Sequence, residues 1–507
     1  MSQSIEAQRD ALVERLRVVN DLHSAAAVLE WDQMVYMPPE GSEGRGRQLA
    51  TLQRLAHEHA TDLEIGRLLD ALEPWAETLP FDDDDAALVR VARRDYERVI
   101  QVPSSFAAEL AEHVTEAYDL WASARPANDF ALVRDSLERT LEMSHRYADF
   151  FPGYEHPADP LIDEEDYGMK ASSVRVLFDE LEARLRPLVN AITAQAPADD
   201  SCLHRHFPET DQRRFSEKVI KAFGYDFDRG RQDKTLHPFE TRFAAGDVRI
   251  TTRFDENDLS SALFSTLHES GHAMYEQGVA LRLDGTPLGH GTSAGVHESQ
   301  SRTWENIVGR SRGFWEHYYP ELQATFPGVL DDVSVDAFYR AVNKVQRSLI
   351  RTEADEVTYN LHVIIRFGLE LEMLEGKLAV RDLPEVWRAR YQEAIGVSSP
   401  TETNGVLQDV HWFAGLIGGS FQGYTLGNIL SAQFYDAALA AHPSIPNEIG
   451  QGQFGTLHDW LRDNIYQHGS KFTTSELVAR ATGGPLSIDP YIAYLTRKYG
   501  DLYGLTF

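Results

Sequence analysis

The sequence predicts a mainly α-helical protein that forms one large body, with a small β-sheet beside one of its helices. Three observations support this fold class. Apolar residues recur three and four positions apart over most of the 507 residues, which is the spacing of one helix face. Only one short stretch has the alternating or β-branched residues expected of strands. No repeat of fixed period indicates a solenoid.

The N-terminal part is predicted to be helical from residue 5 to about residue 146, as the apolar series Leu12, Leu16, Val19 and Leu22 illustrates. Residues 150–168 contain three prolines and two glycines without any period, and they predict a long surface loop. Helical periodicity then returns in longer segments at 173–196, 259–277, 296–314, 335–375 and 383–394.

One segment predicts a β-hairpin. HPFETRF and VRITTRF flank the turn AAGD, and a Gly-Asp pair between two extended runs is typical of a tight connection between antiparallel strands. The helix at 259–277 follows directly, so we expect the small sheet to lie beside it.

Composition and charge exclude several classes of protein. Hydrophobic residues make up 42% and charged residues 25% of the chain, which is typical of folded globular proteins. Lys plus Arg number 48 against 79 Asp plus Glu, and the net charge of −31 disfavours binding to nucleic acid or anionic membranes. The one cysteine, Cys202, cannot form an internal disulfide, and no apolar stretch reaches membrane-spanning length. The charged N-terminal segment lacks the apolar run of a signal peptide, so we expect a cytoplasmic protein.

The helix at 259–277 contains the pattern H-E-x-x-H, formed by His268, Glu269 and His272. Four residues advance a helix by slightly more than one turn, so both imidazoles project from one face and can share a cation. Glu269 then lies within reach of a water molecule on that cation. The alternative is a solvated helix face with two incidental histidines. Gly271 favours the site, because a glycine inside a helix costs stability and is expected where a ligand or another backbone comes close.

A catalytic zinc site requires a third protein ligand and an open fourth position. Glu298 is one candidate, because it lies 30 residues after His268 at the start of a predicted helix, where the helix dipole favours a carboxylate. His290 and His297 compete with it, and Glu298 is equally well placed to cap its own helix. Spacing alone leaves this choice open.

At this point the sequence resembles the carboxypeptidase Taq family of zinc metallocarboxypeptidases, over nearly its whole length. The strings that carry the resemblance, in order, are EWDQMVYMPPEG near Glu30, HPF at 237–239, DVRIT at 247–251, HESGH at 268–272, HESQ at 297–300, IRTEAD at 350–355 and GVLQDVHW at 405–412, with KYGDLYGL at the end. The resemblance implies a helical fold similar to neurolysin and angiotensin-converting enzyme, a deep active-site groove and a homodimer. It also implies removal of C-terminal amino acids from peptides, by one domain over residues 1–507 with a helical part at about 1–150 and a catalytic part at about 230–430.

Carried over residue by residue, the family pattern implies that His268, His272 and Glu298 bind zinc and that Glu269 is the general base. The sequence departs from the family after GVLQDVHW. The family usually continues with Gly-Tyr-Phe-Pro before a tyrosine that precedes Leu-Gly-Asn, whereas this chain has FAGLIGGSFQGYTLGN. Tyr424 aligns with that tyrosine.

Exopeptidase specificity needs a cation that binds the C-terminal carboxylate of the substrate, and the planar fork of arginine suits this task. Arg351 is the first candidate and Arg249 the second, and the alternative for each is a structural salt bridge, with Asp355 or Asp247 as partner. Three further groups are candidates for contact with the substrate: His237 at a groove wall, and His411 and Tyr424 as donors to the oxyanion.

Two rival functions remain at this stage. One is a zinc oligopeptidase that cuts internally, and the other is an inactive peptide-binding scaffold. A binding module does not need a base beside the metal, so the combination of Glu269 with three ligands favours an enzyme. Histidine and carboxylate ligands also accept Co²⁺ or Mn²⁺ in place of Zn²⁺. The expected partners are peptides with a free C-terminus.

Overall fold

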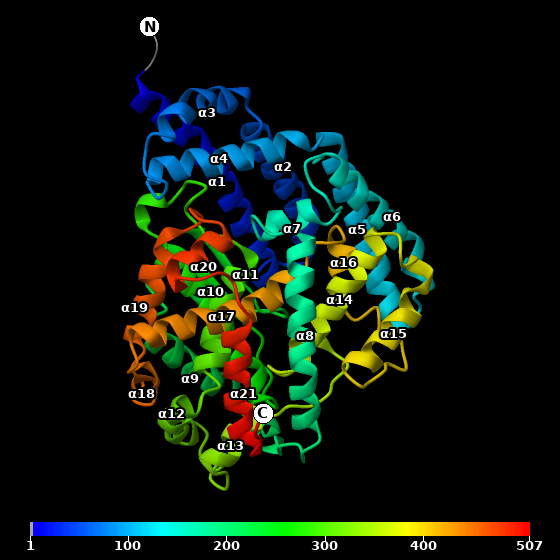
Figure 1. Cartoon of the computed structure of the whole chain (residues 1–507), viewed down its shortest axis with the longest axis vertical. Coiled ribbons are helices and arrows are strands. Elements are labelled where there is room, and N and C mark those ends of the chain that lie inside the picture. Colours follow the sequence, from blue (N-terminus) through cyan, green and yellow to red (C-terminus); the bar gives the residue numbers. More distant parts are fainter. Residues whose placement is uncertain (1–3) are drawn as a thin grey trace.

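Helices make up most of the chain in the structure, a computed structural model that describes residues 4–507 (Figure 1). Residues 1–3, which belong to the segment assessed above for a signal peptide, lie outside the described residues. The fold class predicted from the sequence is confirmed. The N-terminal part contains α1 (Ile5–Val35), α2 (Ser42–Ala60), α3 (Leu63–Ala76), α4 (Asp84–Gln101), α5 (Ser104–Ala127) and α6 (Ala131–Asp149).

The predicted loop at 150–168 is wrong in part, because it contains the short helix α7 (Asp159–Glu165). Pro160 lies in the first turn of this helix, where the missing N–H needs no partner. A proline-rich sequence therefore does not exclude a helix that starts at the proline. The long helix α8 (Ala171–Thr193) agrees with the segment predicted at 173–196, and α9 (Glu209–Phe223) precedes the sheet.

The small sheet has the strand order β1-β3-β2, with β1 (Gln232–Lys234), β2 (Glu240–Ala244) and β3 (Asp247–Thr252). β2 and β3 form the predicted antiparallel hairpin, with an irregularity between Arg242 and Ala244. β1 pairs parallel to β3, and the sequence analysis missed it because three residues are too few for a detectable alternation. The helix α10 (Leu259–Gly278) follows and packs against both β2 and β3, as predicted.

Two predicted helices are interrupted in the structure. The segment at 296–314 is α11 (Ala294–Arg302), then a π-helical segment (Thr303–Val308), then a break at Gly309 before α12 (Arg312–Thr325). The segment at 335–375 is α13 (Val335–Val342), an irregular stretch with a 3₁₀ turn at Arg351–Glu353, and α14 (Tyr359–Leu374). The carboxylate of Asp355 accepts from the backbone N–H groups of Gln346, Val357 and Thr358, which replaces helical hydrogen bonds across this second break.

The C-terminal part is again helical, and it begins with a helix whose bounds are those predicted. Its helices are α15 (Leu383–Ala394), α16 (His411–Ala414), α17 (Gln422–Ala441), α18 (Ile445–Ile449), α19 (Gly455–Asn464), α20 (Thr474–Thr482) and α21 (Asp489–Tyr503). Further 3₁₀ turns lie at Pro39–Gly41, Ser201–His204, Leu281–Leu283, Val380–Asp382 and Tyr466–His468.

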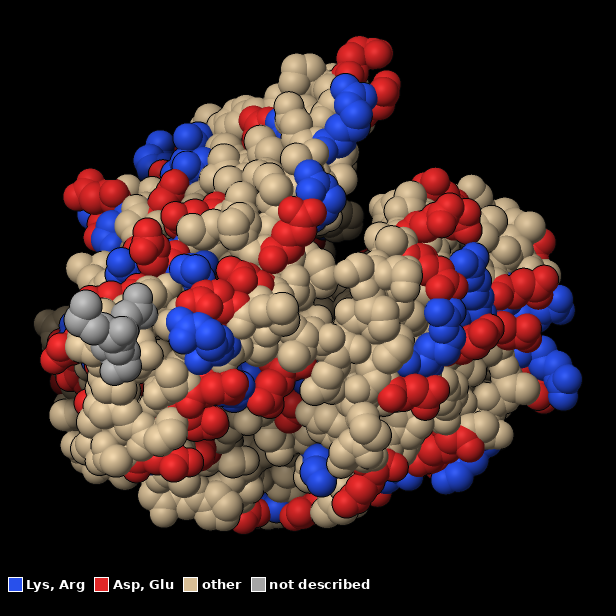
Figure 2. Space-filling model, turned by 90° about the horizontal axis from the view of Figure 1, so that it is seen from above, with Lys and Arg blue, Asp and Glu red and all other residues tan. Residues whose placement is uncertain are grey.

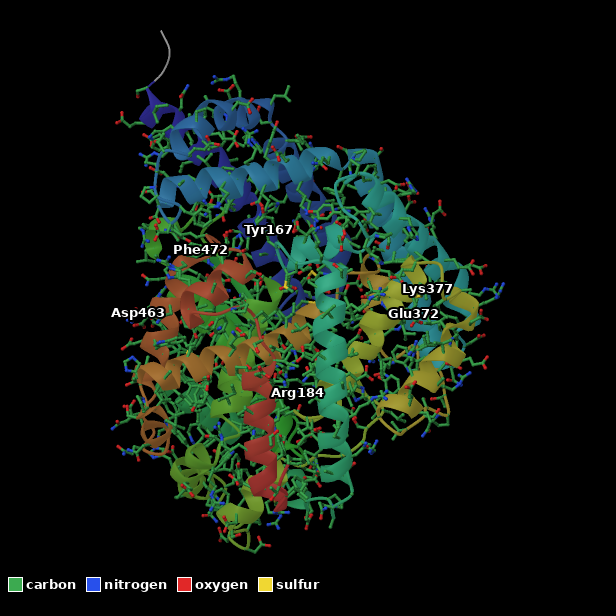
Figure 3. The ribbon with its side chains drawn as sticks, in the orientation of Figure 1. Tyr167, Arg184, Glu372, Lys377, Asp463 and Phe472 are labelled. Atoms are coloured by element: carbon green, nitrogen blue, oxygen red, sulfur yellow. The ribbon has the colours of Figure 1, made fainter. Side chains whose placement is uncertain are left out.

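The N-terminal helices pack onto the C-terminal part of the chain through aromatic and cationic side chains. Phe81 stacks on Phe472 with ring centroids 6.3 Å apart, and Arg94 lies over the ring of Tyr167 at 4.5 Å. Figure 3 shows Tyr167 and Phe472 below α4, between the N-terminal helices and the rest of the molecule. Segments more than 300 residues apart in sequence thus form one body.

The surface is hollowed by a cleft when the molecule is viewed from above, and acidic and basic side chains are interspersed around it (Figure 2). Among the described residues, no helix has the length and apolar character needed to cross a lipid bilayer.

Candidate metal centre

The helix α10 carries His268, Glu269 and His272 on its inner side. It begins at Asp258, whose carboxylate accepts from the N–H groups of Ser260 and Ser261 and caps the first turn. The reason for Gly271 is also visible. A Cβ atom there would lie 2.6 Å from the carbonyl oxygen of Gln300, so α10 and α11 touch backbone to backbone. This close approach brings the third metal-ligand candidate next to the two histidines.

Glu298 on α11 converges with His268 and His272 on one point. The two Nε2 atoms are 3.3 Å apart, and Oε2 of Glu298 lies 3.5 Å from Nε2 of His268 and 3.4 Å from Nε2 of His272. Tetrahedral ligands about 2.05 Å from a zinc ion would be separated by about 3.3 Å. These three residues also form a group of His, Cys, Asp or Glu side chains close enough to hold a metal ion. The residues therefore fit a divalent cation without rearrangement.

The competing histidines lie elsewhere. His290 is exposed, and its Nδ1 contacts the carbonyl oxygen of Gly291. His297 contacts Nδ1 of His272 at 2.6 Å, on the side of the ring away from Glu298. The far nitrogen of His297 lies 2.9 Å from Oε1 of Glu276. His297 thus connects a ligand candidate to a carboxylate and is not itself in the converging group.

Both candidate histidine ligands are held by a partner on the nitrogen that faces away from the cluster. Nδ1 of His268 lies 2.9 Å from Oε2 of Glu305, and His272 is held by the chain of His297 and Glu276. A partner of this kind fixes the tautomer, so that the lone pair of Nε2 points at the metal position. Glu305 belongs to the π-helical segment 303–308, and an interruption of this type is frequent at functional sites.

Arg302 balances the acidic side chains around the cluster. Its Nε donates to Oε1 of Glu298 at 2.7 Å, and Nη1 donates to Glu305 at 3.2 Å. Burial disfavours the charge on Glu298, but Arg302 and the imidazoles outweigh it and hold the pKa of this carboxyl well below its usual range. Glu298 is therefore ionised, which is the form in which a carboxyl group can bind a metal ion.

Glu269 has different surroundings from Glu298, although both are buried. Burial raises the pKa of Glu269 to about 7, with His268 opposing the shift and Glu298 and Glu305 adding to it. No arginine or lysine among residues 4–507 pairs with this carboxyl. A carboxyl group whose pKa lies near neutrality, next to a metal position, is suited to exchanging a proton.

Glu298 reaches the cluster because α17 carries a glycine opposite it. A Cβ atom at Gly427 would lie 2.3 Å from Cγ and 2.5 Å from Cβ of Glu298. The neighbouring contact is also close, since a Cβ atom at Gly423 would lie 3.0 Å from Cβ of Ala294. Any side chain at Gly427 must therefore displace Glu298 or separate α11 from α17.

We expect Gly427→Ala to weaken metal binding by roughly ten- to a hundredfold, because the carboxylate of Glu298 is pushed away from the two histidines. Overpacking should also cost about 1–3 kcal/mol of stability. Competition with a chromophoric chelator measures the metal affinity. The matched control is Gly368→Ala in the interior of α14, where a Cβ atom meets no other atom within 4 Å. Equal affinities for the two variants would contradict this role of Gly427.

A groove of about 720 Å³ opens on the cluster. Its lining includes His268 and Glu269 from α10, Arg302 beside the metal position, and Arg351 from the 3₁₀ turn. Pro238 of the HPF string also lines it, whereas His237 itself is exposed to solvent. The side chains that the HPF and IRTEAD strings supply thus meet at the same groove.

Arg351 is almost fully buried and anchored by Asp409, and not by the Asp355 considered above. Its Nε and Nη2 donate to Oδ1 of Asp409 at 3.2 and 2.8 Å, and Nη1 donates to the hydroxyl of Tyr359 at 2.9 Å. Arg366 pairs with the same aspartate. These bonds use three of the five N–H donors of Arg351, and the other two have no partner among residues 4–507.

Arg249 forms the salt bridge that was the alternative interpretation for it. Nε and Nη2 donate to the two carboxylate oxygens of Asp247 at 2.8 and 2.7 Å, and the guanidinium lies over the rings of Trp31 and Phe243. Its side chain does not line the groove that contains His268.

Arg253 was missed by the sequence analysis. It follows β3 and lines the groove with His268 and Glu269, and its one side-chain hydrogen bond within residues 4–507 is to the hydroxyl of Ser261, at 3.4 Å. None of the carboxylates in the described residues pairs with it. The signal was present, since TTRF directly continues the DVRIT string, but sequence cannot show which arginine lacks a partner.

His411 and Tyr424 lie together, with 3.1 Å between Nε2 and the hydroxyl oxygen. Burial, with Arg351 adding to it, lowers the pKa of His411 to about 4, so this imidazole is neutral at pH 7. Burial raises the pKa of Tyr424 well above its usual value, and the charge of Glu298 is close enough to contribute. A neutral tyrosine hydroxyl near the metal position is a hydrogen-bond donor.

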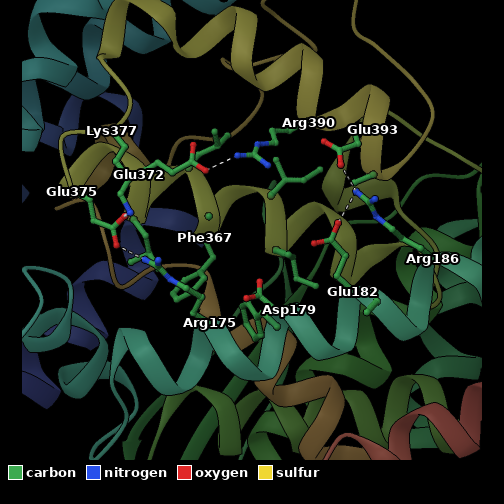
Figure 4. Close-up of a pocket in the computed structure, with 18 residues that line it drawn as sticks. Arg175, Asp179, Glu182, Arg186, Phe367, Glu372, Glu375, Lys377, Arg390 and Glu393 are labelled. Atoms are coloured by element: carbon green, nitrogen blue, oxygen red, sulfur yellow. Dashed lines mark hydrogen bonds and ion pairs between the residues drawn. The ribbon is translucent and has the colours of Figure 1, made fainter.

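A second cavity, of about 620 Å³, lies between α8 and the α14–α15 region, but most of its charged groups pair with one another. Figure 4 shows Arg175 paired with Glu375, Arg390 with Glu372, and Arg186 with Glu182 and Glu393 across an apolar floor. The metal cluster and its groove are therefore the better candidate for a functional site.

Comparisons with known proteins agree with this geometry. The chain matches the model of the carboxypeptidase Taq (M32) metallopeptidase family over residues 11–499. It is 43% identical, over 509 aligned residues, to thermostable carboxypeptidase 1 of Thermus thermophilus, a match that covers 98% of this chain and 99% of the relative. Carboxypeptidase 1 of Bacillus subtilis is 36% identical over 489 residues, covering 96% and 97% of the two chains.

The fold comparison is equally close. The crystal structure of an M32 carboxypeptidase from Deinococcus radiodurans R1 superposes with a TM-score of 0.96 at 50% identity, and the match covers 98% of this chain and 100% of the other. Because the family model, the relatives and the solved structure all match over nearly the full length, the chain belongs to the carboxypeptidase Taq (M32) family of metallopeptidases, enzymes that hydrolyse peptides.

Proposed function

We propose that this protein is a zinc-dependent carboxypeptidase that releases C-terminal amino acids from peptides, with Glu269 as general base. The observation that carries the proposal is the convergence of His268, His272 and Glu298 at 3.3–3.5 Å, with Glu269 adjacent and without a cationic partner among residues 4–507. An inactive peptide-binding scaffold would need neither the ligands nor the base.

Two imidazoles and one carboxylate form a donor set typical of catalytic zinc, although Co²⁺ and Mn²⁺ accept the same ligands. A divalent cation bound there supplies a Lewis acid that makes a water molecule a stronger acid at neutral pH. Glu269 would take up a proton from the water that attacks the peptide carbonyl, and would return that proton to the leaving amine. Tyr424, positioned by His411, donates a hydrogen bond to the oxyanion that forms.

Arg351 is the group that we propose for the C-terminal carboxylate of the substrate. Asp409 and Tyr359 fix its orientation, and the two remaining N–H donors suit a bidentate bond. Arg253 adds a positive charge without an acidic partner in the described residues to the same groove. Arg249 is better explained as a structural residue, because Asp247 and two aromatic rings surround its guanidinium.

The test compares one peptide that has a free C-terminal carboxylate with the same peptide as its C-terminal amide. We expect amidation to lower kcat/KM by roughly a hundredfold, since a charge-assisted bidentate bond is lost. Chromatography of the released amino acid or amide measures both rates. Equal rates, or internal cleavage, would favour the oligopeptidase alternative and contradict the proposal.

A pair of arginine variants tests which arginine binds the C-terminal carboxylate of the substrate. Arg351→Lys keeps the charge but loses the fork, and we expect it to reduce the preference for the free acid. The matched variant Arg249→Lys should retain that preference.

The resemblance also implies a homodimer. Light scattering on the purified protein should then give twice the mass of one chain, which is 57.1 kDa.

A further inference from the structure

Arg351 belongs to a buried cluster of charged side chains. The carboxylate of Asp409 accepts from Nη2 of Arg351 at 2.8 Å and also from Nε of Arg366. The side chain of Arg366 is fully buried, and that of Arg351 is 6% exposed. Within residues 4–507, Asp409 is the one acidic side chain that forms an ion pair with either arginine. Two cations therefore share one anion, which leaves one positive charge in excess.

Glu370 is the nearest acid on the helix that carries Arg366. It follows Arg366 by four residues on α14, so both side chains project from the same face. Glu370 is fully buried, and its Oε1 accepts from Nε1 of Trp412 at 2.8 Å. Oε2 of Glu370 and Nη2 of Arg366 are buried too, and neither has a hydrogen-bond partner within residues 4–507. Nothing in the catalytic proposal above uses this carboxyl group.

The surroundings of Glu370 favour its protonated form near neutral pH. Burial raises the pKa of Glu370 to about 8, although the indole of Trp412, the backbone N–H of Gly418 and the charge of Arg366 oppose the rise. Arg366 is the one charged side chain within residues 4–507 that acts on this pKa. The protonation of Glu370 is therefore sensitive to the charge balance around Arg366.

The helices that pack around α14 supply groups that stay neutral or pair elsewhere. Burial lowers the pKa of His411 on α16 to about 4, and it raises the pKa of Tyr391 on α15 and of Tyr424 on α17 above the usual value. The arginines of α8 and α15 beside α14 line the second cavity and pair with its acids; they are Arg175, Arg186 and Arg390.

The charge of the cluster changes when a carboxylate binds to Arg351. If Glu370 is protonated, the bound carboxylate neutralises the excess positive charge. If Glu370 is ionised, the cluster is already neutral, and a bound carboxylate leaves a buried negative charge in excess, which is unfavourable. A carboxylate therefore binds more tightly when Glu370 is protonated, and by linkage its binding favours the protonated form.

We propose that Glu370 is a positioning residue for the C-terminal carboxylate of the substrate, that it acts on Arg351 through Arg366 and Asp409, and that it takes up a proton from solvent when this carboxylate binds. The inference rests on the role of Arg351 in the proposed function. It makes the preference for a free C-terminus strongest below about pH 7, with a decline as the pH rises through 8.

Proton uptake tests the proposal directly. The ligands are an N-acetylated peptide with a free C-terminal carboxylate and the same peptide as its C-terminal amide. The zinc-loaded Glu269→Gln protein binds them without turnover and without the titration of Glu269. Calorimetry between pH 8 and 9, in two buffers of different ionisation enthalpy, gives the number of protons taken up. We expect the acid to take up roughly half a proton more than the amide. Equal uptake by the two peptides would overturn the inference.

The affinity ratio of acid to amide identifies the group that titrates. In the same protein we expect this ratio to fall by roughly tenfold between pH 6.5 and 9.5, as Glu370 ionises. Addition of Glu370→Gln keeps a neutral side chain of the same shape, so the ratio should stay at its low-pH value. Glu372→Gln is the matched control, because Glu372 lies on the same helix but pairs with Arg390 outside the cluster. It should keep the pH dependence.

The outcomes separate this inference from the proposed function. A ratio that still falls with pH in the Glu370→Gln variant would assign the proton to another group and overturn the inference. A ratio above one that is the same at every pH would also overturn it, but would leave the carboxylate site at Arg351 intact. Equal affinities for acid and amide at every pH would contradict that site, and with it the proposed function. The proton count needs no substitution at Glu370, so it decides the inference even if Glu370→Gln does not fold.

Discussion

Glu269→Gln is expected to lower kcat by on the order of a thousandfold while metal and peptide still bind. The variant is isosteric and leaves His268, His272 and Glu298 in place, but an amide cannot accept a proton from water. Glu269 is buried, and its pKa of about 7 suits it to both halves of the proton transfer. Stopped assays on a short peptide measure kcat, and chelator competition measures the metal affinity.

The matched control is Glu276→Gln on the same helix. Glu276 contacts His297, which contacts His272, so we expect its loss to weaken metal binding by about tenfold and to change kcat little at saturating metal. If Glu269→Gln retained substantial turnover, another base would be required, and the proposed mechanism would be wrong.

Glu298→Gln is expected to have the largest effect on metal binding, with affinity reduced by at least about a hundredfold. The substitution removes the one carboxylate of the converging group and leaves a neutral amide beside the two imidazoles. It also deprives Arg302 of one of its two carboxylate partners, so a loss of thermal stability should accompany it. Metal analysis after gel filtration and chelator competition give the affinity.

Glu305→Gln distinguishes a residue that binds the metal directly from one that only orients a binding residue. Glu305 contacts the outer nitrogen of His268 and does not belong to the converging group, so we expect a loss of only ten- to a hundredfold. A weaker effect for Glu298→Gln than for Glu305→Gln would contradict the assignment of Glu298 as the third ligand.

The local sequence was sufficient to predict features that depend on one helix or on one hairpin. The four-residue spacing of His268 and His272 predicted that they share one face of α10, and the predicted range 259–277 agrees with Leu259–Gly278 to within one residue. The β2–β3 hairpin was equally predictable, because the turn and both strands are contiguous in sequence. The structure agrees on all three points.

Breaks inside long apolar patterns were not predictable. The apolar period continues from α13 into α14, but backbone N–H groups between the two helices donate to the carboxylate of Asp355. The π-helical segment after α11 was also not predictable from the apolar pattern. It contains Glu305, whose carboxylate contacts Nδ1 of His268. Apolar periodicity indicates which residues face the core. It does not indicate which groups form hydrogen bonds with the backbone N–H and C=O groups.

Residue types and spacing by themselves predicted a mainly helical protein and placed His268 and His272 on one helix face, because those signals are local, and the resemblance of several strings implied a metallopeptidase. The tertiary structure alone decided which charges are free. Arg351 and Arg249 look alike in sequence. In the part of the chain that the structure describes, Arg351 retains two N–H donors without a partner, whereas the guanidinium of Arg249 is enclosed by Asp247 and two aromatic rings. Pairing of charges depends on side chains that are far apart in sequence, and only folding brings them within a few ångströms of one another.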